Sequence, residues 1–167
     1  MKKQEKQVIL WEECKSIFKQ TENSHTDRLL KEIIEIVKKY KLILSDVADN
    51  DFLEYITNID SSEFIVGTNG DNYELILKNY IKMDECSLEE IWTILSQLVW
   101  DLSAMVSDKV CPNCRGDHLA YYTDKTNMHL YESCLGCFST WENSKLIKKP
   151  KEIFPAPKNV LSKFQII

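Results

Sequence analysis

Two stretches of the sequence, Cys111-Pro-Asn-Cys114 and Cys134-Leu-Gly-Cys137, decide how the C-terminal part of the chain folds. Each is a C-x2-C pair, and 19 residues separate the two pairs. A four-cysteine zinc site typically has two such pairs about 15–20 residues apart. One tight turn then presents both sulfurs of a pair to the same ion, and four thiolates fill its tetrahedron. The spacing predicts one structural Zn²⁺ per chain, with these ligands: Cys111, Cys114, Cys134 and Cys137.

The residues between the two pairs are typical of a β-hairpin. His118–Thr123 and Met128–Ser133 are rich in aromatic and β-forming residues, and Asp124–Asn127 separates them as a turn. Pairs and hairpin together resemble the zinc ribbons over residues 109–142, although a ribbon typically begins C-P-x-C-G and here Arg115 stands before the glycine. The resemblance implies a small β-finger that folds only when its metal is bound.

The four cysteines have three alternative uses. Disulfides are disfavoured because no signal peptide is visible, so we expect a reducing cytoplasmic location. A redox C-x-x-C pair would need a βαβ context, which the sequence lacks. Iron in a rubredoxin-like site uses the same four ligands, and spacing does not distinguish it from zinc. The isolated Cys14 and Cys86 are expected to be buried apolar residues, and His118 and His129 to have surface or packing roles.

Charge divides the chain into unequal parts. The 167 residues hold 21 basic and 26 acidic side chains, a net charge of −5. Residues 1–108 carry 12 basic against 21 acidic residues, whereas residues 109–167 carry 9 against 5. From residue 44 to 108, only Lys78 and Lys82 oppose 14 acidic residues. We therefore expect an acidic helical domain at 1–108, the zinc ribbon at 109–142 and a basic, proline-containing extension at 143–167.

Hydrophobic periodicity makes the first part mainly helical. Apolar residues recur at three- and four-residue spacing, including Val8, Trp11 and Phe18 on the first expected helix. A Ser87-x-x-Glu90 capping box precedes the most apolar of these segments. Amphipathic helices are predicted over residues 5–19, 25–40 and 46–59, and after Ser87. Residues 73–81 fit either a further helix, which is favoured, or the return strand of a hairpin. A short strand is predicted at 63–66, followed by an Asn69-Gly70 turn. The fold class is therefore α+β: a mainly helical N-terminal body with a small C-terminal zinc-ribbon hairpin.

The C-terminal extension and the absence of long apolar runs set two further expectations. Phe154–Pro157 should be extended, because proline restricts its own backbone and that of the residue before it. Its apolar end leaves two interpretations open, a strap that packs back on the body or a disordered basic tail. No stretch of about 20 nearly uncharged apolar residues is present, so no membrane span is expected.

Two functions fit this profile. The first is a non-enzymatic protein-binding module, since no catalytic motif is visible. In overall character the chain resembles the immunity proteins of bacterial toxin systems, including contact-dependent inhibition. The resemblance implies that an acidic surface binds and neutralises a basic toxin, often a nuclease. The candidate partner-binding residues are Asp46, Asp49, Asp51, Glu54, Asp60, Glu63, Asp71 and Glu74.

The second function is a zinc-ribbon regulator or nucleic-acid-associated factor. Lys145, Lys148, Lys149 and Lys151 would supply the cations, and four aromatic residues could offer stacking surfaces. The net negative charge argues against generic nucleic-acid binding, because such binding depends on cations that replace the counterions of phosphates. The four aromatic residues are Tyr121, Tyr122, Tyr131 and Trp141.

Overall fold

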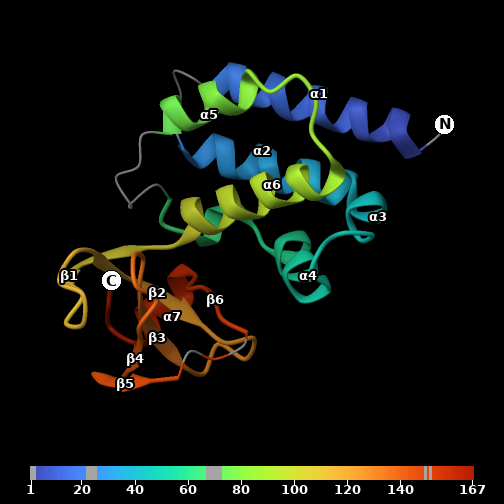
Figure 1. Ribbon diagram of the computed structural model, residues 1–167. Helices are drawn as coiled ribbons and strands as arrows, with labels where there is room; N and C mark the ends of the chain where they lie inside the picture. Colours follow the sequence, from blue (N-terminus) through green and yellow to red (C-terminus); the bar gives the residue numbers. More distant parts are fainter. Residues whose placement is uncertain (1–2, 22–25, 67–72, 149, 151) are drawn as a thin grey trace. The chain divides into compact units, whose positions relative to one another are not determined.

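A computed structural model describes residues 3–21, 26–66, 73–148, 150 and 152–167 (Figure 1). The fold is α+β, as predicted: helices dominate the N-terminal part, and an antiparallel sheet forms the C-terminal part. The chain makes two compact units. The helical unit comprises Met1–Ser61 and Gly70–Leu102, and the sheet unit comprises Ser62–Asn69 and Ser103–Ile167. The division at residues 108 and 142 stays a prediction.

The helical unit is built from α-helices connected by short segments. In it α1 packs against α2 and α5, and α2 also packs against α4. No helix of the described segments is both long and apolar enough to cross a membrane. The helix bounds are α1 Lys3–Thr21, α2 Thr26–Lys39, α3 Lys41–Leu44, α4 Asn50–Asn58, α5 Tyr73–Ile81 and α6 Leu88–Ser103.

The buried face of α1 differs from the expected one at its N-terminal end. Trp11 and Phe18 are buried as predicted, but Val8 is 57% exposed. The face instead begins at Gln7, which lies four residues before Trp11 and whose side-chain amide donates to the Cys86 carbonyl at 2.8 Å. One residue turns a helix by about 100°, so Val8 points away from this face. Polar Gln7 concealed the true start of the face from a hydrophobic pattern.

The capping box before α6 is confirmed. The backbone N–H of Ser87 donates to Glu90 Oε2 at 2.7 Å, and the N–H of Glu90 donates to Ser87 Oγ at 3.2 Å. These reciprocal bonds satisfy two of the donors that every helix N-terminus leaves without an intrahelical partner. They fix the point at which the apolar side of α6 enters the core.

The segment before α5 contains a wrong secondary-structure prediction, the strand at 63–66. Ser61–Glu63 is a short 3₁₀ helix, η1, and residues 64–66 form no strand. A strand there would need a partner, but Tyr73–Ile81, considered as its return strand, is the helix that the sequence favoured. Phe64 is buried and Ile65 packs into the sheet unit, so this apolar run serves core packing. Asn69-Gly70 lies outside the described residues.

The sheet unit is an antiparallel meander in the order β1-β2-β3-β4-β5, with β6 also paired to β2. The predicted hairpin is confirmed: Leu119 pairs with Cys134 and Tyr121 with Glu132. Its turn is held by the Asp124 carboxylate, which accepts from the N–H of Met128 at 3.1 Å. The strand bounds are β1 Val106–Val110, β2 His118–Thr123, β3 Leu130–Cys134, β4 Thr140–Glu142, β5 Lys145–Ile147 and β6 Phe154–Pro155.

The C-terminal extension packs onto this sheet. Phe154–Pro157 is extended, as expected, and leads into helix α7, Lys158–Lys163. Val160 and Leu161 are buried against Tyr121 in one apolar cluster that Ile65 also contacts. The described tail therefore belongs to the core of its own unit.

Candidate metal centre

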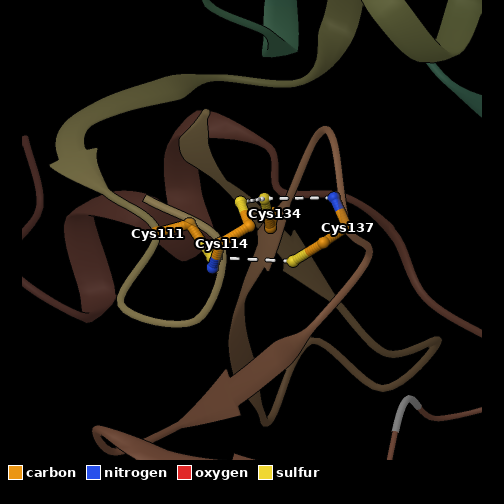
Figure 2. A group of neighbouring side chains, drawn as sticks. All are labelled: Cys111, Cys114, Cys134 and Cys137. Atoms are coloured by element: carbon orange, nitrogen blue, oxygen red, sulfur yellow. Dashed lines mark hydrogen bonds between the residues drawn. The ribbon is translucent and has the colours of Figure 1, made fainter. Parts of the chain in front are cut away.

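The four cysteines lie on two turns that the sheet brings together. Cys111 directly follows β1, and the turn from Cys111 to Arg115 begins the connection to β2. Cys134 ends β3, and the turn from Cys134 to Phe138 leads toward β4. Because Leu119 of β2 pairs with Cys134, the β2–β3 ladder carries both turns to one end of the sheet. Figure 2 shows the four side chains pointing toward one another.

Both turns have the same hydrogen-bond pattern. The N–H of Cys114 donates to Cys111 Sγ, and the N–H of Cys137 donates to Cys134 Sγ, each at 3.4 Å. The Arg115 N–H also donates to the Cys111 carbonyl at 3.0 Å, and the Phe138 N–H to the Cys134 carbonyl at 3.1 Å. Two C-x2-C sequences thus fold into equivalent turns, each presenting two sulfurs to the same side.

The residue that ends each turn has a left-handed backbone. Arg115 has φ 54° and Phe138 has φ 57°. Glycine occupies this conformation without strain, whereas a residue with a Cβ atom costs about 1–2 kcal/mol there. The departure from the C-P-x-C-G pattern of zinc ribbons therefore puts an unfavourable residue, Arg115, at the position where the pattern has glycine.

The four sulfurs are arranged as a ligand set. All lie within 4.8 Å of one another. Cys111 Sγ is 3.6 Å from Cys137 Sγ, and Cys114 Sγ is 3.6 Å from Cys134 Sγ. Disulfide sulfurs lie about 2.05 Å apart, so these are free thiols. Four thiolates about 2.3 Å from a tetrahedral ion would be about 3.8 Å apart, and the observed separations match that geometry. The cluster can hold a metal ion.

The surroundings favour different protonation states for these thiols. Hydrogen bonds from the side chain and backbone of Ser139 lower the pKa of Cys137 to about 6. Burial raises the pKa of the Cys134 thiol to about 12. Four thiolates this close together repel one another strongly, and a cation among them relieves that repulsion. A positive ion bound among the four sulfurs would therefore stabilise them as thiolates.

Apolar packing and backbone hydrogen bonds hold the cysteines in position. Cys111 and Cys134 are buried with Leu119 and Trp141 in one cluster. The Cys111 N–H donates to the Asp117 carbonyl at 2.8 Å, which closes the first turn onto β2. Gly136 allows a close approach between the turns, because a Cβ atom there would lie 3.0 Å from Asp117 Oδ2.

Two residues beside the sulfurs were not anticipated from the sequence. The Asn113 side-chain amide donates to Ser139 Oγ at 2.9 Å and reaches Cys137 Sγ at 3.8 Å. The Ser139 hydroxyl also lies 3.2 Å from Cys137 Sγ. Asn113 is one of the two variable residues of its pair, and Ser139 follows the second pair, so neither belongs to a spacing pattern. Their closeness to ligands in the sequence was the one available signal.

The acidic candidate residues lie on several elements. Most belong to the segment from α3 to η1, and Glu74 lies on α5, paired with Lys78. Asp49 caps α4, accepting from the Phe52 N–H at 2.9 Å, and Asp51 is half-buried. Asp71 lies outside the described residues. The exposed members are Asp46, Asp49, Glu54, Asp60, Glu63 and Glu74.

The aromatic residues suggested for stacking on nucleic acid are buried, so their rings cannot stack on bases. Tyr121, Tyr122, Tyr131 and Trp141 are only 3–7% exposed. The sequence did not reveal this burial, because β2 is covered on both faces for most of its length and therefore does not alternate between buried and exposed residues. His129 is exposed, in line with the expected surface role. Its Nδ1 lies 2.7 Å from Glu142 Oε1.

The two isolated cysteines are buried, as predicted. Cys14 is fully buried on α1, and burial raises the pKa of its thiol to about 12. Burial also raises the pKa of Cys86. Both therefore remain protonated thiols at neutral pH and act as small apolar residues.

Comparison with known proteins gives no relative. No protein-family model matches the chain, and no curated protein or solved structure is significantly similar to it. A function for this chain therefore has to be argued from its own residues.

Proposed function

We propose that the four cysteines hold one structural Zn²⁺ per chain. Thiolates are soft ligands, and four of them in a tetrahedron suit zinc or iron. Zinc is the ordinary occupant of paired C-x2-C structural sites. When bound, it supplies positive charge that stabilises the four thiolates and joins the two turns. Since protein ligands fill all four positions, we assign the ion a structural role with no substrate position.

The helical unit is, in this proposal, a non-enzymatic protein-binding module. The observation that carries this role is the excess of exposed carboxylates. Asp46, Glu54 and Asp60 are exposed on the α3–η1 segment, within a stretch where 2 basic residues oppose 14 acidic ones. Such a surface attracts a basic partner, raises the association rate and disfavours acidic partners.

The partner class that fits best is a basic toxin domain, which makes this chain an immunity protein. A nuclease toxin binds phosphates with cationic side chains, and carboxylates could occupy those same groups. Cytoplasmic residence would suit both the free thiols and the neutralisation of a toxin that acts there. The regulator alternative is the weaker proposal, because the aromatic rings that it would use for stacking are buried.

A growth assay tests the proposed function. If a toxin-like protein is encoded beside this chain, it would be expressed in a sensitive host, with and without the chain. We expect the chain to restore growth and to form a complex with the purified toxin domain. The absence of a toxic neighbour, or a toxic neighbour that the chain neither binds nor neutralises, would refute the immunity role.

Charge reversal then tests the acidic surface. Asp46→Lys combined with Glu54→Lys should slow association by about 3- to 10-fold at low salt, and less at high salt, because screening weakens long-range attraction. Asp49 is left intact because its loss would remove the α4 cap. Biolayer interferometry with the toxin domain would measure both rates. An association rate that ignores salt and both reversals would show that these carboxylates only keep the protein soluble.

A further inference from the structure

A groove on the helical unit lies between the end of α5 and one side of α6. Ile94 is only 6% exposed, and Tyr80 and Met83 are half-buried. These three residues give the groove an apolar base, whereas its longer polar side chains are exposed. The lining residues are Tyr80, Met83, Glu89, Glu90, Thr93, Ile94 and Gln97.

The charged side chains that line this groove are acidic. Glu89 and Glu90 are the charged residues that line it, and both are exposed. The Ser87 N–H donates to Glu90 and lowers the pKa of that carboxyl, so it stays ionised at neutral pH. Residues 83–102 of the helical unit contain 5 acidic and no basic residues, and Lys82 directly precedes them. An apolar surface is thus set in a negative field.

We propose that this groove binds a basic amphipathic helix of a protein partner. The apolar face of that helix would pack on Tyr80, Met83 and Ile94, and its lysine or arginine side chains would face Glu89 and Glu90. This is the helix-in-groove mode of recognition, with charge complementarity choosing the partner. The inference rests on the proposed protein-binding role and assigns it a contact surface outside the α3–η1 segment.

Charge also favours a basic helix over nucleic acids, anionic lipids and a second copy of this chain as the occupant of the groove. Phosphates of nucleic acids and anionic lipid headgroups would be repelled by the glutamates, whereas a cationic helix is attracted. A second copy of this chain would bring its own negative net charge of −5 to the contact. Only a cationic, apolar segment satisfies both the base and the edge of the groove.

A synthetic peptide tests the groove without the natural partner. The probe is a 14-residue helix former (about 21 Å long) made of leucine on one face and lysine on the other. A peptide of equal composition in scrambled order, and a leucine–glutamate peptide, are the controls. The full zinc-loaded chain would be titrated and followed by ¹H–¹⁵N NMR. We expect the amphipathic basic peptide to shift Met83, Thr93, Ile94 and Gln97 most, and the controls to shift them little.

Two matched variants sharpen the result. Glu89→Lys should weaken peptide binding by about 5-fold, which is close to 1 kcal/mol. Glu12→Lys makes the same change on the exposed side of α1 and should leave binding unchanged. Shifts centred elsewhere, equal losses in both variants, or equal binding of the scrambled peptide would overturn the inference. A concentration-dependent dimer that Glu89→Lys abolishes would overturn it in favour of a second copy.

The groove and the immunity role can fail separately. If Glu89→Lys neutralises the toxin as well as the unaltered chain does, and the peptide does not bind, the groove is wrong and the immunity role stands. If the peptide binds as expected but no toxin is neutralised, the groove stands and the immunity role fails.

Discussion

Removing the metal ligands should unfold one part of the sheet unit and spare the helices. Cys111→Ser removes a fully buried sulfur, and Cys137→Ser an exposed one. Both should abolish stoichiometric zinc binding, because three thiolates and a hydroxyl hold the ion far less tightly. The helical unit contains none of the four cysteines, so its helices should persist.

The size of the effect follows from what surrounds the site. Ordering costs about 1.5 kcal/mol per residue, or roughly 15 kcal/mol for the two five-residue turns. Burial of Leu119 and Trp141 recovers about 2–3 kcal/mol each, or roughly 5 kcal/mol together. Zinc binding contributes about 10–16 kcal/mol in small metal-stabilised domains, which is enough to offset the remainder. Without the ion, we therefore expect both turns to lose their fixed structure.

Elemental analysis and NMR measure the loss of zinc and the loss of structure in the two turns. Elemental analysis should give about one zinc per chain for the unaltered protein and little for either serine variant. Amide signals of 111, 113–115 and 134–138 should lose their dispersion, while helical far-UV circular dichroism is retained. Cys86→Ala is the matched control, since it removes a buried thiol outside the cluster and should keep its zinc. A Cys111→Ser protein with full zinc content, or metal-free protein with ordered turns, would refute the reasoning.

Three further predictions concern local features, and a fourth concerns nucleic acid. Ser87→Ala should destabilise the protein by about 1 kcal/mol in urea unfolding, because it removes the acceptor for the Glu90 N–H. Hydrogen bonds from Ser87 lower the pKa of the Glu90 carboxyl, so ionised Glu90 stabilises the folded protein above the ordinary carboxyl pKa. This stabilisation is lost as the pH falls through the lowered pKa. The free energies of unfolding of Glu90→Gln and the unaltered protein should therefore differ at pH 7 and converge in acid. Arg115→Gly should raise stability by about 1 kcal/mol, since glycine relieves the left-handed backbone at φ 54°; a lower melting temperature would contradict this. At about 0.15 M salt the chain should not bind random duplex DNA below micromolar concentration in fluorescence anisotropy, and a tight, salt-sensitive complex would favour the regulator alternative.

Local sequence rules predicted much of the fold and of the four-cysteine cluster. Two C-x2-C pairs and a turn-separated pair of β-forming segments depend on neighbours in the sequence, so the ligand spacing and the hairpin followed from the chain alone. The register did not, because β3 begins at Leu130, two residues after the expected start at Met128. The Ser87–Glu90 box is equally local. These features needed no knowledge of which elements pack together.

Features that depend on packing between distant residues were missed. Gln7 belongs to the buried face of α1 because the Cys86 carbonyl lies opposite it, 79 residues away. Residues 64–66 have the composition of a strand, but the sheet offers them no pairing partner. Tyr122 is buried in a part of β2 that pairs with β6, more than 30 residues further along the chain. The groove beside α6 is lined from two helices, so no single periodicity could have indicated it.

The sheet unit takes its residues from two separate stretches of the chain. Ile65 packs with Leu161 in one apolar cluster, and Lys158 Nζ donates to the Ser62 carbonyl at 2.8 Å. A fragment that starts at Ser103 would therefore lack part of its own core. The polypeptide also passes between the units more than once, so a single protease cut after Leu102 leaves a covalent link near Ser61–Ser62. Such a nicked protein should give two bands in a denaturing gel yet elute from gel filtration as one species.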